Sequence, residues 1–290
     1  MQTTKLGNTE IAISRIGLGA MPLSLANRPS EEQAISVIHR ALQLGVTLID
    51  TADSYCKDEN DKHHNEILIA KALSTYRGNT DDIIVATKGG LMRPSGDWTV
   101  NGNPDHLRKT INESYEALGG THPIPLWQWH APDDRYPIRQ SLKPVKEAVD
   151  QKLIRFVGLS NVSVDEIKQA QTMFPIVSIQ NQYNPWCRNP ERDGVLQYCE
   201  DQKLTFLPWS PLGGSRRVKL IGNFKELAKV ARERDASPHC LVLAWLMAKS
   251  PCIVPIPGAT RIQSLEDSLA AEKINLSASE ISAIEKDFPG

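Results

Sequence analysis

The sequence has no excess of charge of either sign and no long apolar segment. Its 290 residues include 33 Lys and Arg against 34 Asp and Glu, which gives a net charge of −1. Proteins that bind nucleic acid usually carry a basic excess or a basic face, so this composition argues against a nucleic-acid partner. The longest uncharged apolar run, Cys240–Ala248, is about half of the ~20 residues that a membrane-spanning helix needs. We therefore expect neither nucleic acid nor a membrane as a partner.

Cysteine pairs and an apolar leader are also missing. Residues Met1–Lys5 contain no apolar stretch of the kind found in a secretory signal. His63 and His64 are adjacent, so they cannot share a helix face as two metal ligands would, and we expect them on a solvated surface. The cysteines are scattered without a C-x-x-C pair, which argues against a disulfide framework and a zinc ribbon; they are Cys56, Cys187, Cys199, Cys240 and Cys252. These features predict a cytoplasmic protein without a metal site.

What the sequence does have is a regular alternation of short apolar runs and longer amphipathic ones. The apolar runs resemble strands that are covered on both faces; they are Arg15–Gly19, Val46–Asp50, Asp82–Lys88, Leu126–His130, Arg155–Ser160, Ile176–Gln180, Leu204–Trp209 and Cys252–Ile256. Eight strands alternating with seven or eight helices predict an α/β fold, a single (β/α)₈ TIM barrel domain spanning residues 1–290. A doubly wound sheet stays open as an alternative, because periodicity alone does not close a sheet.

Local signals mark several element boundaries. Gly7-Asn8 lies between two short alternating runs and predicts an N-terminal β-hairpin outside the repeat. Ser30 followed by Gln33 predicts a capping box at the start of a helix. Asn103-Pro104 and Ser237-Pro238 predict two further helix starts.

Polar residues follow the apolar runs at nearly every predicted strand end. In chain order these ends are Gly19, Asp50, Lys88, His130, Ser160-Asn161, Gln180-Asn181, Trp209-Ser210 and Pro257-Gly258. In a barrel the carboxyl ends of the strands converge on one rim, which is where barrel enzymes place their chemistry. A lysine, an aspartate, a histidine and two amides at these positions therefore favour an active site over simple turn formation.

Several short motifs, in order and over essentially the whole chain, resemble the aldo-keto reductase superfamily. The sharpest is Leu48-Ile-Asp-Thr-Ala-Asp-Ser-Tyr55. The others are Ala86-Thr-Lys-Gly-Gly90, Trp129-His-Ala-Pro-Asp133, Gly158-Leu-Ser-Asn161, Trp209-Ser-Pro-Leu-Gly-Gly214 and Val254-Pro-Ile-Pro-Gly-Ala-Thr-Arg261. The tail and the last of these segments also resemble bacterial-type relatives that reduce pyridoxal.

The resemblance implies a catalytic tetrad of Asp50, Tyr55, Lys88 and His130. A carbonyl that accepts hydride needs a proton donor beside its oxygen, and Tyr55 is expected to be that acid. Because a phenol with a pKa near 10 is a weak acid at neutral pH, we expect the Lys88 ammonium to lower the Tyr55 pKa while Asp50 keeps Lys88 charged. His130 is expected to hydrogen-bond the same oxygen and orient the substrate.

The resemblance also implies an NADP(H) site, because no side chain donates hydride. Ser160, Asn161 and Gln180 would hold the carboxamide, and Trp209 would stack on the nicotinamide. The pyrophosphate segment would be Ser210, Pro211, Leu212, Gly213 and Ser215, and the adenosine end would be Gly258, Thr260, Arg261, Ser264, Asp267 and Ser268. Gly19, Ala20, Met21 and Asp50 complete the expected cofactor-binding residues.

Two departures from the family pattern concern the adenosine end. The family usually has Glu-Asn where this chain has Asp267-Ser268, and serine cannot supply both an amide donor and an acceptor. The usual basic residue is replaced by Ser264. The preference for NADPH over NADH therefore depends on Arg261, whose guanidinium suits a 2′-phosphate, with Arg216 and Arg217 as alternatives.

Three further side chains have readings that the sequence leaves open. Trp98 lies in a polar loop after the third predicted strand, and Trp186 follows the sixth. Each could line a substrate pocket or simply pack. Cys56 follows Tyr55 and could be exposed near the site with a redox role, although we expect it to be inert.

The predicted function is NADPH-dependent reduction of small aldehydes or ketones, with Tyr55 as general acid and a small carbonyl compound as the partner. Pyridoxal is one candidate substrate. A slow, nicotinamide-binding sensing subunit is the alternative from another class. A metal-dependent barrel hydrolase would need clustered ligands at the strand ends, where only Asp50 and His130 qualify. We expect a monomer or a weak homo-oligomer.

Overall fold

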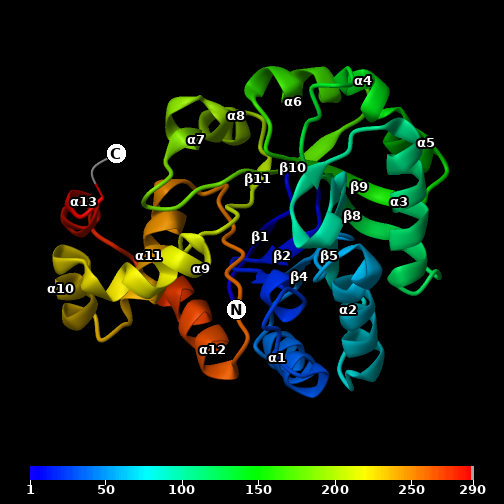
Figure 1. Cartoon of the computed structure of the whole chain (residues 1–290). Helices are drawn as coiled ribbons and strands as arrows, with labels where there is room; N and C mark the ends of the chain where they lie inside the picture. Colours follow the sequence, from blue (N-terminus) through cyan, green and yellow to red (C-terminus); the bar gives the residue numbers. More distant parts are fainter. Residues whose placement is uncertain (289–290) are drawn as a thin grey trace.

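A computed structural model describes residues 1–288 of the chain, and its centre is a curled sheet of parallel strands (Figure 1). The strands are β3 (Leu18–Gly19), β4 (Leu48–Asp50), β5 (Ile84–Gly89), β8 (Ile124–Trp129), β9 (Ile154–Ser160), β10 (Ile176–Gln180) and β11 (Thr205–Phe206). Their order in the sheet is β11-β10-β9-β8-β5-β4-β3, and every neighbouring pair is parallel. Each strand therefore lies beside the strand that precedes or follows it in the barrel sequence, as a (β/α)₈ barrel requires.

The eighth predicted strand closes the barrel without forming a regular ladder. On one side, Val254 N donates to the Phe206 carbonyl at the end of β11 (2.9 Å). On the other, Gly19 N of β3 donates to the Pro257 carbonyl (3.0 Å). Pro255 and Pro257 have no N–H to give, so the segment accepts more ladder bonds than it donates. The predicted barrel is confirmed, and its last strand is an irregular closing segment.

Helices cover the outside of the barrel (Figure 1). They are α1 (Glu31–Gln43), α2 (His64–Thr75), α3 (Pro104–Ala117), α4 (Ile138–Ser141), α5 (Lys143–Asp150), α6 (Val164–Gln171), α7 (Asn189–Arg192), α8 (Val195–Asp201), α9 (Gly214–Arg217), α10 (Lys225–Glu233), α11 (Pro238–Lys249), α12 (Ile262–Ala270) and α13 (Ala278–Lys286). Within residues 1–288, none of these helices is long and apolar enough to cross a membrane.

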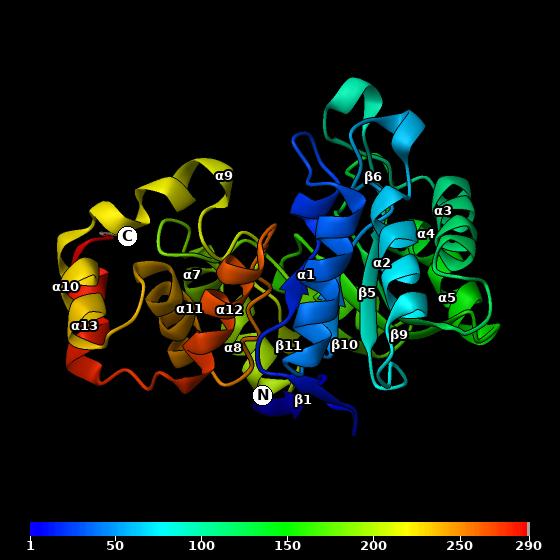
Figure 2. The same cartoon turned by 90° about the horizontal axis from the view of Figure 1, so that it is seen from below.

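The predicted N-terminal hairpin is confirmed and fills the lower end of the barrel. Strand β1 (Thr3–Lys5) pairs antiparallel with β2 (Ala12–Ser14). Leu6 and Ile13 are fully buried and pack with barrel-interior residues of several strands, among them Leu126. Figure 2 shows β1 at the bottom of the barrel, while a second hairpin and α9 project from the top. That second hairpin consists of β6 (Leu91–Met92) and β7 (Thr99–Val100).

The predicted helix starts are present, with one difference. Ser30 accepts a hydrogen bond from Gln33 N and caps α1. The reciprocal half of the capping box is missing, because the Gln33 side-chain amide donates to the Thr260 carbonyl instead (2.7 Å). Gln33 thereby ties α1 to the segment that we expect to face adenosine.

Candidate active site

The four expected catalytic residues meet at the upper rim of the barrel. Asp50 ends β4, Lys88 lies on β5, and His130 follows β8 directly. Because β4, β5 and β8 are consecutive in the sheet, their carboxyl ends bring these side chains together. Tyr55 enters the same space from the loop after β4. All four are buried, with exposed fractions of 6% or less.

Lys88 connects the group. Its Nζ lies 2.7 Å from an Asp50 carboxylate oxygen and donates to the Tyr55 hydroxyl at 2.9 Å. It also donates to the Thr51 carbonyl at 2.8 Å. These contacts fix the ammonium between an anion and a phenol in a site that excludes bulk water, where electrostatic interactions are strong.

The charge state of Tyr55 differs from the sequence-based expectation. Burial, followed by the negative charge of Asp50, raises the pKa of Tyr55 well above its ordinary value. The predicted lowering by Lys88 is therefore wrong for this structure: desolvation disfavours the phenolate, and Asp50 offsets the lysine charge. Burial also lowers the pKa of Lys88, and Asp50 opposes that change. Tyr55 is thus a neutral phenol that still carries its proton at neutral pH.

His130 is held by its backbone. Its N–H donates to the Gly89 carbonyl (2.9 Å), and its carbonyl accepts from the Asn161 side-chain amide (2.9 Å). The imidazole lies edge-on to the Tyr55 ring, with ring centroids 5.9 Å apart. Burial and the nearby Lys88 charge lower the pKa of His130 well below its ordinary value, so the imidazole is neutral. Its buried Nδ1 has no hydrogen-bond partner within residues 1–288.

The three residues expected to hold a carboxamide lie directly beside the tetrad. Gln180, at the end of β10, donates to the Asp50 carboxylate (2.8 Å). Ser160, at the end of β9, donates to the Gln180 carbonyl (2.7 Å). Asn161 follows with a left-handed backbone (φ 59°), a conformation that asparagine tolerates better than most residues. The neighbouring strand ends therefore present amide and hydroxyl groups to one space.

The expected nicotinamide and pyrophosphate residues lie on the loop after β11. Trp209 is partly exposed, and its indole N–H donates to the Asn161 side-chain oxygen (2.9 Å). Beyond it, Ser210 has a left-handed backbone, while Pro211 is buried and Leu212 is partly buried. Gly213 also has a positive φ, and the exposed Ser215 belongs to α9.

The expected adenosine residues lie on the loop before α12 and on its first turns. Arg261 is exposed and precedes α12, and no ion pair forms to it within the described part of the chain. Asp267 accepts a hydrogen bond from the Ser237 hydroxyl (2.7 Å). Ser268 is buried and donates to the Ser264 carbonyl (2.9 Å). Asp267 and Ser268, which stand where the family usually has Glu-Asn, are therefore already hydrogen-bonded within the protein.

Two glycines and their neighbours form the junction between β3 and the closing segment. Gly258 pairs with Gly19 in a parallel bridge. A Cβ on Gly19 would lie 2.5 Å from the Ile256 carbonyl oxygen, so only glycine fits there. Ala20 is fully buried, and Met21 begins the short helix η1 (Met21–Leu23). This junction brings the first and last of the segments expected to bind cofactor side by side.

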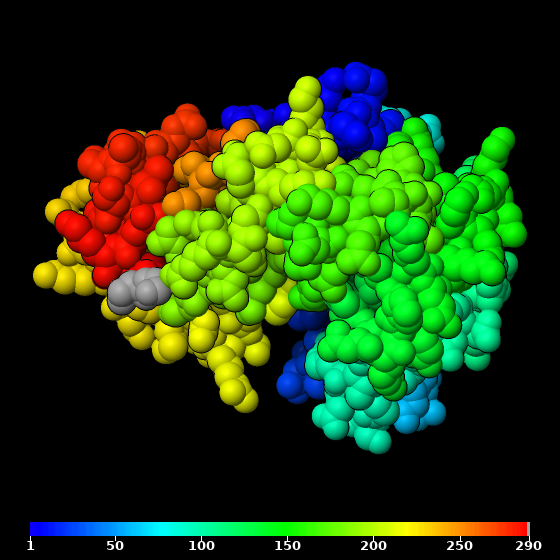
Figure 3. All heavy atoms as spheres, turned by 90° about the horizontal axis from the view of Figure 1, so that it is seen from above, coloured from blue at the N-terminus to red at the C-terminus, as the bar shows by residue number. Residues whose placement is uncertain are grey.

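Trp98 lies beside two of the expected catalytic residues. Its ring centroid is 6.3 Å from that of Tyr55 and 6.5 Å from that of His130, although 44% of Trp98 is exposed. The Arg93 guanidinium stacks 4.0 Å from the Trp98 ring. Figure 3 shows a notch in the surface between the α9 region and the β6–β7 hairpin that carries Trp98.

Cys56 is inert as expected, the expectation for His63 is wrong, and that for Trp186 is decided in favour of packing. Cys56 is fully buried, and burial raises the pKa of its thiol to about 12, so it is no exposed redox group. His63 is mostly buried and contacts Glu66 (2.6 Å), rather than lying in solvent. Trp186 packs against Phe224 and Phe288. Within residues 1–288, no group of His, Cys, Asp and Glu residues could hold a metal ion.

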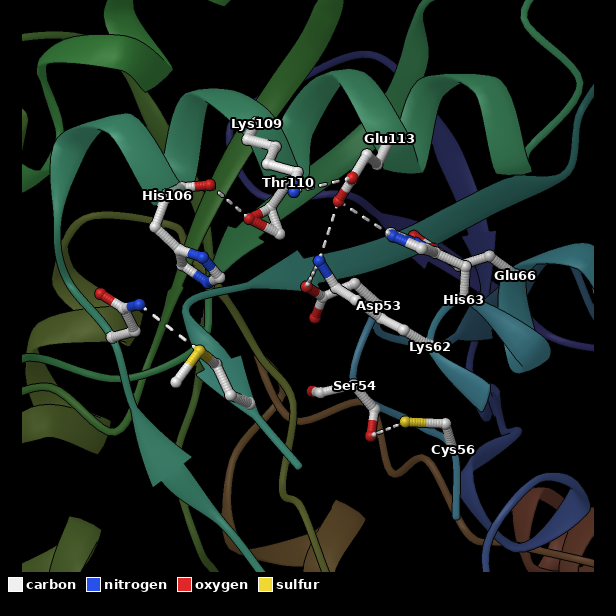
Figure 4. Close-up of polar contacts among 12 residues, drawn as sticks. Asp53, Ser54, Cys56, Lys62, His63, Glu66, His106, Lys109, Thr110 and Glu113 are labelled. Carbon is white, nitrogen blue, oxygen red and sulfur yellow. Dashed lines mark hydrogen bonds and ion pairs between the residues drawn. The ribbon is translucent and has the colours of Figure 1, made fainter. Parts of the chain in front are cut away.

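The structure also reveals a buried polar cluster that the sequence did not single out. Asp53 and Glu66 are both fully buried close to the tetrad, and Figure 4 shows them with Lys62, His63 and Glu113. Asp53 belongs to the motif that ends at Tyr55, but nothing in the sequence distinguished it from a turn residue. Glu66 gave no signal at all, because a glutamate in the first turn of a helix is ordinarily solvated.

Comparisons with known proteins agree with this geometry. The family model described as the aldo/keto reductase family matches residues 15–287. The chain is 35% identical to an uncharacterized oxidoreductase of Schizosaccharomyces pombe, over 98% of this chain and 89% of that protein. The fold is similar to a thermostable aldo-keto reductase crystallised with the inhibitor epalrestat (TM-score 0.82, 30% identity, 99% of this chain and 100% of that one). It is also similar to an aldo-keto reductase of Klebsiella pneumoniae in complex with NADPH (TM-score 0.83, 21% identity, 99% and 95%). With its barrel, its N-terminal hairpin and a match over nearly its whole length, the chain belongs to the aldo-keto reductase family.

Proposed function

We propose that this protein is an NADP(H)-dependent reductase that converts small aldehydes or ketones to alcohols, with Tyr55 as the proton donor. The observation that carries the proposal is the position of the buried Lys88 ammonium, in contact with both the Asp50 carboxylate and the Tyr55 hydroxyl. A phenol held this way is neutral, oriented and able to give up a proton that Lys88 helps to release. We infer that residues 1–290 act as one catalytic domain, in the cytoplasm, as a monomer or a weak homo-oligomer.

The residues present fit a nicotinamide dinucleotide phosphate. Ser160, Asn161 and Gln180 offer hydroxyl and amide groups beside the tetrad, which suits a carboxamide. Arg261 offers an exposed guanidinium at the other end of the segment, which suits a phosphate monoester. The NADPH complex of the similar Klebsiella pneumoniae protein supports the same cofactor. When bound, the nicotinamide supplies the hydride that no side chain can.

The chain's own residues supply the proton and the orientation. Tyr55 gives its hydroxyl proton to the carbonyl oxygen as that oxygen gains negative charge. Lys88 stabilises the resulting phenolate, and Asp50 keeps Lys88 in place. The neutral imidazole of His130 lies beside the Tyr55 ring and can donate a hydrogen bond to the same oxygen. Burial of all four groups keeps competing water away.

NADPH oxidation by the purified protein tests this proposal, with a panel of aliphatic and aromatic aldehydes that includes pyridoxal. We expect turnover on several members of the panel without added metal and in the presence of a chelator. Tight NADPH binding without turnover on any carbonyl would instead favour the sensing subunit. Failure to bind either nicotinamide cofactor would contradict both functions.

Trp98 is expected to select aromatic substrates. Its exposed ring lies next to Tyr55 and His130, so a planar substrate at the tetrad could stack against it or meet its edge. Trp98→Ala should lower kcat/KM about 10-fold for aromatic aldehydes and much less for aliphatic ones, since an aromatic contact is worth about 0.5–1.5 kcal/mol beyond the area it buries. Steady-state kinetics with paired substrates measures the ratio. Trp98→Phe serves as the matched control that retains a ring, and equal losses for both substrate classes would refute the assignment.

Arg261 is expected to discriminate between the two nicotinamide cofactors. Arg261→Ala removes the guanidinium proposed to contact the 2′-phosphate, so the Kd for NADPH should rise about 10- to 100-fold, the loss of one charge-assisted contact of about 1.5–3 kcal/mol. The Kd for NADH should change little. Fluorescence titration with both cofactors tests this, and Arg216→Ala is a control on the neighbouring basic cluster. If Arg216→Ala alone caused the loss, the 2′-phosphate contact would belong to α9 instead.

A further inference from the structure

A second buried carboxylate lies behind the catalytic pair. Asp53 is two residues before Tyr55, and its backbone N–H donates to the Lys88 carbonyl (3.1 Å). Its own carbonyl accepts from His63 N (2.8 Å). Asp53 is therefore tied on one side to the strand that carries the catalytic lysine, and on the other to the turn that starts α2. The backbone of Asp53 is thereby held in place, and its side chain is buried.

The Asp53 carboxylate is almost without partners. The residue is fully buried, and no side chain within residues 1–288 donates a hydrogen bond to either carboxylate oxygen. The nearest cation is Lys62, whose Nζ lies 3.5 Å from Oδ2. An isolated buried carboxylate is costly and tends to take up a proton instead. A structural carboxylate would ordinarily be fully hydrogen-bonded, so Asp53 calls for another explanation.

Lys62 links this carboxylate to the surface. Its Nζ lies 3.0 Å from Glu113 of α3, and its side chain is partly exposed. Figure 4 shows Lys62 between Asp53 and Glu113, with His63 on the other side of Glu113. Glu66 is engaged elsewhere, by His63 and by the Thr87 hydroxyl. Lys62 is therefore the cation that balances Asp53, and it also forms an ion pair with the partly exposed Glu113 carboxylate.

The charge of Asp53 reaches the catalytic residues. Burial raises the pKa of Asp53 to about 7, with Lys62 and His63 acting against that change and Glu66 adding to it. Ionised Asp53 in turn raises the pKa of Tyr55 and favours the ammonium form of Lys88, adding to the effects of Asp50. It also acts on the buried thiol of Cys56. The Asp53 carboxylate therefore acts on the reaction through its charge, because no hydrogen bond joins that carboxylate to the Lys88 or Tyr55 side chain.

We propose that Asp53, balanced by Lys62, is a positioning residue whose charge holds Lys88 as an ammonium and Tyr55 as a protonated phenol. The proposal rests on the reductase function above and assigns a role to a residue outside the tetrad. Ionised Asp53 extends proton donation by Tyr55 to higher pH. Protonated Asp53 removes that support and makes the phenolate, which the reverse oxidation of an alcohol needs, easier to form.

Asp53→Asn tests the proposal because it keeps the shape and removes the charge. The alkaline limb of the pH profile for carbonyl reduction should move to lower pH by about one unit, the size of a single-charge effect in a partly screened protein interior. Glu113→Gln is the matched control: it removes another carboxylate next to Lys62 that is farther from the tetrad, and should move the limb much less. A correctly folded Asp53→Asn protein with an unchanged limb would overturn the proposal, as would an equal shift in Glu113→Gln.

A spectroscopic arm separates this inference from the proposed function. The ultraviolet absorbance of ionised Tyr55, taken as the difference between each protein and its Tyr55→Phe derivative, should titrate at lower pH in Asp53→Asn. Lys62→Met should move the same titration to higher pH, because it leaves Asp53 unbalanced. Lys62→Met still tests the proposed effect of Asp53 on Tyr55 if Asp53→Asn does not fold. If the Tyr55 titration shifts in opposite directions in the two variants but no carbonyl is reduced, the reductase function is wrong and the charge coupling holds. If carbonyls are reduced but the Tyr55 titration does not shift, only the charge coupling is wrong.

Discussion

Tyr55→Phe is expected to lower kcat for carbonyl reduction by about 10²- to 10⁴-fold, the usual contribution of a general acid. The substitution removes one hydroxyl, the group that accepts from Lys88 at 2.9 Å, and leaves the aromatic packing of Tyr55 against Trp98 and His130. Because Tyr55 is not among the residues expected to bind cofactor, the Kd for NADPH should change by less than about 3-fold. A tenfold change in Kd corresponds to about 1.4 kcal/mol of binding free energy, so the expected change is smaller than that. Stopped-flow measurement of hydride transfer, beside NADPH titration, separates the two quantities.

Tyr76→Phe is the control for the loss of a tyrosine hydroxyl. Tyr76 ends α2 and stacks near His39, away from the rim, so its loss should leave kcat unchanged. Retention of more than a tenth of the wild-type rate in Tyr55→Phe would mean that another group, such as His130 or bound water, delivers the proton.

Lys88→Met is expected to cost stability as well as activity. It leaves the buried Asp50 carboxylate without its cation, and breaking a buried pair from one side typically costs about 3–5 kcal/mol. Urea denaturation of both proteins at neutral pH measures the loss directly. Activity should fall with it, because the Tyr55 hydroxyl loses the neighbour that stabilises its anion.

The double variant Asp50→Asn/Lys88→Met is the matched test of this cause. With both charges removed, no uncompensated ion remains, so the double variant should be more stable than Lys88→Met alone. If the double variant were less stable than Lys88→Met, the loss would come from packing of the lysine stem and not from the stranded carboxylate.

Most of the fold and of the candidate site could be predicted from the strands and from the residues at their carboxyl ends. Periodicity located the strands because both of their faces are covered, which makes them apolar throughout. Asp50, Lys88 and His130 could then be grouped, since parallel strands that are neighbours in a barrel end at one rim. The closing segment was the exception, because Pro255 and Pro257 replace ladder donors, and a pattern of apolar residues does not report the absence of an N–H.

What the sequence could not supply was the local dielectric. His63 was expected in solvent and is mostly buried, and the alternative of an exposed Cys56 is excluded because its side chain is fully buried. The same burial reverses the expected direction of the Tyr55 pKa. Asp53 shows this limit of the sequence most clearly. An aspartate in this motif is compatible with a solvated turn, and only its burial in the folded structure raises its pKa to about 7.

The N-terminal hairpin has a consequence for how the chain is made. Gly7 N donates to the hydroxyl of Thr205, 198 residues later, and the Arg15 guanidinium donates to the Ile253 carbonyl across 238 residues. Contacts with such large sequence separation slow folding, because the cost of closing the loop comes before the contact is gained. During synthesis, Leu6 and Ile13 emerge well before their barrel partners of the later strands. We therefore expect the open lower end of the barrel to be the surface that a nascent chain exposes longest, and the one where chaperones act and aggregation begins.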